Sequence, residues 1–222
     1  MPRLDVWLIE QRKFTSRQAA KRAIKAGHVT VNGKLAKPST QVKGTEIVII
    51  SSDASDLPIG YEKIKQLDEI SGFDIVKPGN LALDIGSSAG GFLCYLAEKK
   101  ASAIGIEISK EFEEKLKAVV NKHENLSLII GDAFFIDPID ICPENELDLL
   151  LIDVTTDASG TISLIERFSP LLKENGKLVA AFKIKVIKPD VVNRISSLGY
   201  TKLETITLDK SRQELHLIAF RQ

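Results

Sequence analysis

From residue 81 onward, short apolar runs alternate with segments whose apolar residues recur at helical spacing. The run LALDI at 81–85 is nearly all apolar, as expected of a parallel strand covered on both faces. Phe92, Leu93 and Leu96 then repeat along one helix face. The same alternation predicts strands at 103–107, 126–131, 147–153, 177–184, 200–207 and 214–220, and helices at 110–121, 160–173 and 189–198. We therefore expect a doubly wound, mostly parallel, seven-stranded α/β sheet with an antiparallel strand at its end.

The first 50 residues follow a different pattern. Leu4, Trp7 and Leu8 are spaced as one face of a short helix. A second helix is expected at 17–26, where Thr15 or Ser16 can cap its first turn.

The segment HVTVNGKLA alternates around Asn32-Gly33, which is the strongest short signal for a β-hairpin. Another strand is expected at 46–50, so residues 1–50 predict a small α+β domain. The segment SSDASDLPIG at 51–60 is polar and lacks apolar periodicity, and we interpret it as a linker to a second domain at 61–222.

Charge separates the same two regions. Residues 1–50 carry a net charge of +7 and the remaining 172 residues carry −7, although the whole chain is neutral. No apolar run approaches the roughly 18 residues that span a bilayer, and charges interrupt the N-terminus too early for a signal sequence. We expect a cytoplasmic protein with no membrane partner. Cys94 and Cys142 lie far apart and outside any Cys/His cluster, so neither a disulfide framework nor a zinc site is predicted.

The segment after the first strand carries a glycine-rich turn. Glycines let backbone amides approach a ligand closely, and the following helix N-terminus favours a carboxylate or phosphate. The dinucleotide fingerprint GxGxxG is absent, since Ser88 stands at its second glycine, and this disfavours NAD. Any βαβ unit can carry glycines at this turn. However, D-x-G-x-x-x-G-G followed by the strand-ending Glu107 resembles the cofactor site of class I methyltransferases, whose sheet is Rossmann-like.

This resemblance implies S-adenosylmethionine as the cofactor. Glu107 would accept hydrogen bonds from the ribose hydroxyls. Asp132 would contact the adenine, with Phe134 or Phe135 stacking on it, unless both phenylalanines belong to the core. The implied cofactor-binding residues are Asp84, Gly86, Ser88, Gly90, Gly91, Phe92, Glu107 and Asp132.

Basic residues form a row on the second predicted helix. The order of parts, R-L-D near the start, then S-R-x-x-A-x-x-x-I-x-x-G-x-V-x-V-N-G, resembles the RNA-binding domain of the ribosomal-protein-S-four type. That resemblance implies binding of structured RNA, and a basic stripe suits phosphate contacts, although a charged helix face is often merely solvated. The candidate RNA-binding residues are Arg3, Arg17, Lys21, Arg22 and Lys25.

Four charged residues complete the picture. The stretch from Lys65 to Phe92 and the segment SRQELHLIAF resemble the FtsJ-like ribose methyltransferases. Lys65, Asp153, Lys183 and Glu214 match the Lys-Asp-Lys-Glu tetrad of that class, although unrelated surface charges would give the same letters. With the N-terminal domain, the chain resembles the haemolysin A (TlyA) family of ribosomal RNA 2′-O-methyltransferases.

Three segments depart from that family. The turn reads SSAGG, the segment after Asp153 reads TTDASG without the usual aromatic residue, and Lys183-Ile184-Lys185 replaces a lysine-proline pair. Strand alternation puts Lys183 and Lys185 on one face, so the choice between them stays open, and alignment favours Lys183.

The resemblance implies methyl transfer from S-adenosylmethionine to a ribose 2′-hydroxyl of ribosomal RNA, without a metal. Lys183 would activate the hydroxyl with its pKa lowered by burial and by a neighbouring cation, while Lys65, Asp153 and Glu214 position it. The altered segments keep a second hypothesis open, in which an RNA-binding or ribosome-assembly factor carries an inactive methyltransferase domain. The sequence lacks the Asn-Pro-Pro-Tyr-like signature that base methylation leads one to expect after the fourth strand. No apolar segment supports membrane lysis.

Overall fold

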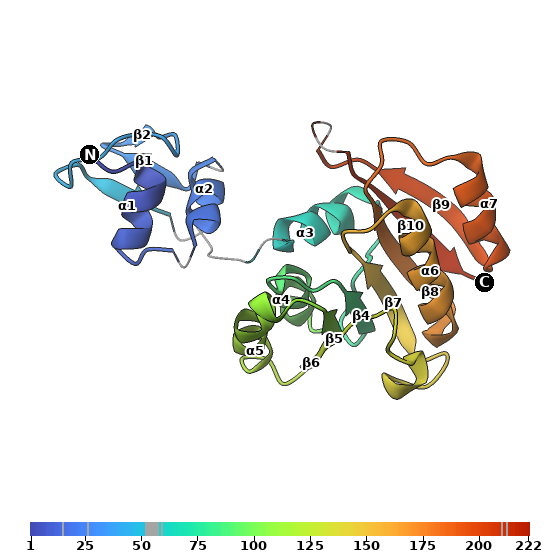
Figure 1. Cartoon of the computed structure of the whole chain (residues 1–222). Coiled ribbons are helices and arrows are strands. Elements are labelled where there is room, and N and C mark those ends of the chain that lie inside the picture. Colours follow the sequence, from blue (N-terminus) through green and yellow to red (C-terminus); the bar gives the residue numbers. More distant parts are fainter. Residues whose placement is uncertain (15, 26, 52–57, 59, 210, 212) are drawn as a thin grey trace. The chain divides into compact units, whose positions relative to one another are not determined.

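A computed structural model describes residues 1–14, 16–25, 27–51, 58, 60–209, 211 and 213–222. The chain divides into two compact units, Met1–Pro58 and Ile59–Gln222 (Figure 1). The boundary lies inside the predicted linker at 51–60, but residues 52–57 and 59 lie outside the described residues, so the linker stays a prediction. Among the described residues, no helix is long and apolar enough to cross a membrane.

The first unit packs two helices against a small antiparallel sheet. Helices α1 (Leu4–Glu10) and α2 (Arg17–Lys25) precede strands β1 (Val29–Val31), β2 (Lys34–Leu35) and β3 (Val48–Ile50), which pair in the order β2-β1-β3. Asn32 and Gly33 have φ values of 51° and 74°, as a two-residue type I′ hairpin requires. Leu4, Leu8 and Ile24 are buried in its core.

The caps of the second helix are partly described. The Ser16 hydroxyl accepts a hydrogen bond from the Ala19 amide at 3.1 Å, which is the role expected of a capping residue. Thr15, the alternative cap, and Ala26, the predicted last residue of this helix, lie outside the described residues.

The second unit is the predicted doubly wound sheet. Its strand order is β6-β5-β4-β7-β8-β10-β9, and all neighbours are parallel except β10, which is antiparallel to β8 and β9. The strands are β4 (Leu81–Ile85), β5 (Ser102–Glu107), β6 (Leu126–Ile130), β7 (Leu147–Ile152), β8 (Leu172–Phe182), β9 (Tyr200–Ile206) and β10 (Leu215–Arg221). The fold class and the strand number predicted from the sequence are confirmed.

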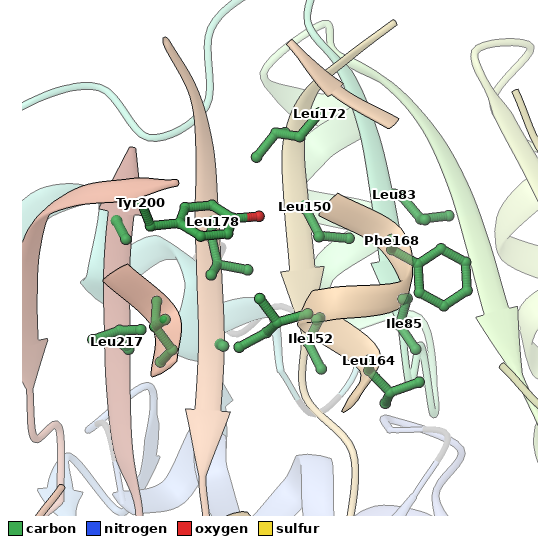
Figure 2. Packing of buried hydrophobic residues seen from close by; sticks show 14 of the residues in the cluster. Leu83, Ile85, Leu150, Ile152, Leu164, Phe168, Leu172, Leu178, Tyr200 and Leu217 are labelled. Atoms are coloured by element: carbon green, nitrogen blue, oxygen red, sulfur yellow. The ribbon is translucent and has the colours of Figure 1, made fainter. Parts of the chain in front are cut away.

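Helices flank this sheet in the order expected of alternating strands and helices. They are α4 (Gly91–Glu98), α5 (Glu113–Val120), α6 (Ala158–Phe168) and α7 (Pro189–Ser197), with 3₁₀ turns η1 (Lys110–Phe112), η2 (Pro138–Asp140) and η3 (Ser169–Leu171). Helix α4 contacts α5, and α6 contacts α7 (Figure 1). Figure 2 shows Leu164 and Phe168 of α6 in one cluster with Leu83, Ile85 and Leu150 of the central strands.

The largest differences from the predicted boundaries concern α6 and β8. The helix predicted at 160–173 ends at Phe168, because Pro170 cannot continue the α-helix, η3 starts at Ser169 and β8 begins at Leu172. Strand β8 ends at Phe182, so Lys183 and Lys185 follow the strand and its alternation does not fix their sides.

Helix α3 (Tyr61–Ile70) lies between the predicted linker and β4, where no helix was predicted. Its buried residues Tyr61, Ile64 and Leu67 recur every third position, which is a helical spacing. The buried carboxylate of Asp68 fixes its end by accepting hydrogen bonds from the Ile75 amide at 2.6 Å and the Tyr95 hydroxyl at 2.6 Å. This anchoring determines which α3 side chains reach the sheet edge.

Candidate active site

A cleft of about 360 Å³ opens where the parallel strands end. Most of its lining residues end β4, β5, β6 or β7 or belong to the segments just beyond these strands, among them Gly86, Ser88, Glu107, Asp132, Phe134 and Asp153. The carboxyl edge of an open α/β sheet is where such folds bind ligands. Of the eight predicted cofactor-binding residues, Gly86, Ser88, Glu107 and Asp132 line this cleft.

The glycine turn is shaped for close approach of the backbone. Gly86 has a φ of 89°, and a Cβ atom there would lie 2.5 Å from the Asp153 carbonyl oxygen. Gly90 has a φ of 84°, and a Cβ would lie 3.2 Å from Val119. Ser88 itself adopts a φ of 49°. A side chain at Gly86 is therefore excluded both by conformation and by space, which leaves the backbone as the surface of the turn.

The Glu107 carboxylate is held beside that turn. It accepts hydrogen bonds from the Ser88 amide at 2.7 Å and from the Ser109 amide at 2.8 Å. Each carboxylate oxygen retains a further lone pair, so Glu107 can accept two ribose hydroxyls while the backbone fixes its orientation.

Asp84, on β4, is a second buried carboxyl group beside Glu107. Both of its carboxylate oxygens are buried without a hydrogen-bond partner among the described residues. Burial, and then the nearby charges of Asp153 and Glu107, raise the pKa of Asp84 to about 7. An unpaired buried carboxyl group beside a cleft is suited to receive a cationic group such as an amino-acid ammonium.

Phe92 and the two phenylalanines after Asp132 have different surroundings. Phe92 is 6% exposed and packs toward Gly60, so it belongs to the core and does not line the cleft. The Asp132 carboxylate accepts a hydrogen bond from the Phe134 amide at 2.9 Å, and Phe134 lines the cleft. Neither Phe134 nor Phe135 is buried, at 40% and 84% exposed, so the alternative that placed both in the core is wrong.

A cluster of four charged side chains lies next to this cleft. The Lys183 ammonium lies 2.7 Å from Asp153 Oδ1 and 2.5 Å from Glu214 Oε2. The Lys63 ammonium lies 2.6 Å from Asp153 Oδ2 and 2.8 Å from Glu214 Oε1. Each lysine therefore bridges both carboxylates, and each carboxylate oxygen takes one lysine. Hereafter we call Lys63, Asp153, Lys183 and Glu214 the active-site cluster.

Topology brings this cluster together. Asp153 and Lys183 directly follow β7 and β8, which are parallel neighbours. Glu214 directly precedes β10, and because β10 runs antiparallel to β8, its first residue meets the carboxyl edge of the sheet. The prediction that Asp153, Lys183 and Glu214 lie together agrees with these contacts. Of the two lysines left open, Lys183 bonds to the carboxylates, whereas Lys185 is exposed.

The structure corrects the first lysine of the predicted tetrad. Lys63, not Lys65, contacts Asp153 and Glu214. Both lysines lie on α3, and two residues correspond to a rotation of about 200° around a helix. Tyr61, Ile64 and Leu67 are spaced as one apolar face of a helix, and this spacing is the signal that could have predicted α3. On such a helix Lys63 and Lys65 point in different directions.

Charge pairing dominates the ionisation of the cluster. Burial raises the pKa of Asp153, but Lys63 and Lys183 outweigh it and hold that pKa below its usual value. His216, followed by Lys183 and Lys63, holds the pKa of Glu214 far below its usual range. Burial lowers the pKa of Lys183, but Asp153 and Glu214 outweigh it and the pKa is raised. The expected lowering of the Lys183 pKa is therefore wrong, because two carboxylates contact its ammonium.

Three of the five candidate RNA-binding residues, Arg3, Arg17 and Lys21, surround a buried acid that was not among the predicted site residues. Asp5 is fully buried, and its carboxylate lies 3.0 Å from Arg3 Nε, 2.9 Å from Arg17 Nε and 3.9 Å from Lys21 Nζ. Although burial raises the pKa of Asp5, hydrogen bonds from Arg3 and Arg17 outweigh it and lower that pKa. Hereafter we call Arg3, Asp5, Arg17 and Lys21 the basic cluster. Arg22 is half-buried and Lys25 is exposed on the same helix.

Comparison with known proteins gives one family match for each of the two units of the chain. Residues 60–213 match the FtsJ-like methyltransferase family, and this match covers more than half of the chain. The chain belongs to the FtsJ-like methyltransferase family. Residues 2–48 match the S4 domain.

Two curated relatives of this FtsJ-like chain carry ribosomal RNA methyltransferase names. The 16S/23S rRNA (cytidine-2′-O)-methyltransferase TlyA of Mycobacterium tuberculosis is 31% identical over 103 residues, which cover 46% of this chain and 38% of the relative. The ribosomal RNA large subunit methyltransferase E of Legionella pneumophila is 27% identical over 135 residues, which cover 57% and 58%. The chain thus spans less than two thirds of the length of these relatives.

Solved structures share the fold. A putative hemolysin from Streptococcus thermophilus aligns over 100% of this chain and 88% of its own, with a TM-score of 0.61 and 16% identity. Fibrillarin from Aeropyrum pernix, solved with natively bound S-adenosyl-L-methionine, aligns over 67% and 69%, with a TM-score of 0.58 and 20% identity. At these identities the likeness establishes the fold.

Proposed function

We propose that this protein is an RNA methyltransferase that transfers a methyl group from S-adenosylmethionine to a ribose 2′-hydroxyl. The observation that carries the proposal is the active-site cluster, in which the Lys183 ammonium lies within 2.7 Å of both Asp153 and Glu214. Asp153 also lines the cleft, so the cluster and a bound cofactor would share one wall. Membership of the FtsJ-like family and the cleft at the glycine turn support the same reaction.

The residues that line the cleft, together with Asp84 buried on β4 beside it, fit S-adenosylmethionine. The turn at Gly86 excludes a side chain, Glu107 has lone pairs for two ribose hydroxyls, and Asp84 is a buried carboxyl group without a partner among the described residues. Asp132 and Phe134 both line the cleft, which supports a contact of these residues with the adenine base. When bound, S-adenosylmethionine supplies an electrophilic methyl group and a positive charge. The turn at Gly86, which has no room for a side chain, would let the cofactor approach the backbone closely, and Asp84 would pair with its ammonium.

The active-site cluster has to activate the ribose hydroxyl, which is a poor nucleophile at neutral pH. Lys183 at rest is an ammonium, since its pKa is raised, and an ammonium cannot accept a proton. With both lysines protonated the cluster is neutral, and a positive charge in the cleft favours the loss of one lysine proton. A neutral Lys183 would accept the proton of the ribose hydroxyl, while Lys63, Asp153 and Glu214 would hold its Nζ in place.

We propose ribosomal RNA as the substrate and the cytoplasm as the site of action. The S4 domain match and the basic cluster support an RNA partner, because arginine side chains that are 45% and 52% exposed can contact phosphates. Since a relative bears the name 16S/23S rRNA (cytidine-2′-O)-methyltransferase, cytidines of ribosomal RNA are the first positions to test.

The proposal can be tested with tritium-labelled S-adenosylmethionine. The measurement is methyl transfer to purified ribosomal subunits and to free ribosomal RNA. Mass-spectrometric mapping of the product should locate the new methyl group on a ribose. We expect the protein to incorporate tritium into RNA. Lys183→Met should abolish this incorporation, and Lys185→Met should leave it intact.

A second candidate function is RNA binding without catalysis. The observation that favours it is the TTDASG segment, because Thr155 and Thr156 line the cleft where the resemblance leads one to expect an aromatic residue. Retained RNA binding with no incorporation into any ribosomal RNA would support it and contradict the enzymatic proposal. Methyl groups on bases alone would contradict the ribose assignment.

A further inference from the structure

His216 lies beside the active-site cluster but belongs to neither the predicted nor the observed tetrad. It is the second residue of β10, is 2% exposed, and pairs across the sheet with Ala181 of β8 and Ile206 of β9. Its Nε2 atom lies 3.3 Å from Glu214 Oε1. At its present orientation neither imidazole nitrogen completes a hydrogen bond with the described residues.

The buried imidazole of His216 lines a second cavity. The cavity measures about 220 Å³, and its lining includes Lys63, Glu214 and His216, with Glu62, Gln66 and Asp209 around them. Lys63 and Glu214 therefore face this cavity, whereas Asp153 faces the cofactor cleft. Buried polar atoms without partners are uncommon in folded proteins, and those at a cavity next to a reactive cluster point to a role in the site.

The position of His216 relative to Glu214 suggests what that role is. Glu214 Oε2 is taken by Lys183, and Glu214 Oε1 is shared between Lys63 at 2.8 Å and His216 at 3.3 Å. A neutral imidazole with its proton on Nε2 can donate to Oε1 after a small rotation of the ring, which leaves Nδ1 as an acceptor. A donor at this point fixes the carboxylate plane, and with it the two lysines that the carboxylate holds.

We propose that His216 is a positioning residue for methyl transfer, which donates from Nε2 to Glu214 and thereby holds this carboxylate against Lys63 and Lys183. The proposal rests on the proposed function of the active-site cluster. It makes a requirement that packing alone does not make: the side chain at position 216 must be a hydrogen-bond donor.

Two substitutions separate positioning from packing. His216→Gln keeps an N–H donor at a similar reach and does not titrate, whereas His216→Leu fills the buried space without a donor. We expect His216→Leu to lower kcat by about 10- to 100-fold with little change in the KM for S-adenosylmethionine. His216→Gln should retain kcat within about threefold of the unchanged protein. Thermal unfolding of both variants checks that each is folded.

The kinetic outcomes decide the proposal in either direction. A folded His216→Leu variant with unchanged kcat would overturn it. A folded His216→Gln variant that is as impaired as His216→Leu would also overturn it, because the donor would then be irrelevant.

Nitrogen-15 NMR of the imidazole decides the contact without any activity. The His216 signal, assigned by its loss in His216→Leu, should show the Nε2–H tautomer, and Glu214→Ala should remove that preference. An Nδ1–H tautomer, or an imidazole unaffected by Glu214→Ala, would overturn the inference. Failure of the unchanged protein to methylate any RNA would instead overturn the proposed function, while the NMR result still decides whether His216 holds Glu214.

Discussion

Each unit of the chain contains a cluster in which basic side chains surround carboxylates. The two clusters differ in their ratio of acidic to basic residues. In the basic cluster one fully buried carboxylate, Asp5, meets Arg3, Arg17 and Lys21. In the active-site cluster two carboxylates meet two lysines, and all four side chains are between 14% and 29% exposed.

The difference separates binding from proton chemistry. The basic cluster keeps an excess of positive charge on arginines that do not titrate near neutral pH, and their exposed ends can contact phosphates. The active-site cluster is electrically balanced and partly shielded from water, so the loss or gain of one proton changes its charge and its chemistry. The same pairing of acids and bases thus serves different ends, depending on which sign is in excess and how much water reaches it.

Removal of the bridging lysine should have the largest effect. Lys183→Met should lower methyl transfer by about 10³-fold, because the group that accepts the hydroxyl proton is lost. Lys185→Met is the matched control, since Lys185 is exposed and lies two residues away. Single-turnover transfer of labelled methyl groups measures both variants. Equal losses in the two variants would contradict the assignment of Lys183.

The second lysine provides a sharper comparison along one helix. Lys63→Met should lower methyl transfer by about 10²-fold, because Asp153 and Glu214 each lose a partner. Lys65→Met should stay within about twofold of the unchanged protein, since Lys65 points elsewhere on α3. If Lys65→Met proved the more damaging variant, the corrected tetrad would be wrong.

The two clusters should respond differently to pH. The Lys183 pKa is raised, so at neutral pH only a small fraction of this side chain is neutral, and that fraction grows about tenfold per pH unit. The single-turnover rate should therefore rise by up to about tenfold between pH 7 and pH 8. RNA affinity measured at the same salt concentration should change by less than about twofold, because arginines keep their charge. A rate that is flat over this range would argue against Lys183 as the proton acceptor.

The smallest effect concerns Asp5, where two explanations predict opposite signs. If Asp5 orients Arg3 and Arg17, Asp5→Asn should weaken RNA binding by about fivefold. If Asp5 acts only as a negative charge, its removal should strengthen RNA binding. Glu10→Gln removes one exposed acid from the same unit and is the matched control. Filter binding at several salt concentrations, with circular dichroism to check folding, distinguishes the two.

Much of the fold follows from patterns within short segments. The apolar runs of β4 and β7 and the helical spacing of α4 identify the alternation, and parallel strands place their carboxyl ends along one edge. For this reason Asp153, at the end of an apolar strand, and Glu107, at the end of another, could be recognised as candidate site residues. The boundaries were less accurate, because β8 begins earlier and ends earlier than its apolar pattern indicates.

The sequence by itself thus determined the order of strands and helices from residue 81 onward, the glycine turn, and three members of the active-site cluster. Only the tertiary structure decided that Lys63 replaces Lys65, that Asp5 gathers three cations, and that His216 lies beside Glu214. The physical reason is that periodicity describes one segment at a time. A contact such as Lys63 with Asp153 joins residues 90 positions apart, and its partners are selected by how α3 is anchored and by how the sheet orders its strands.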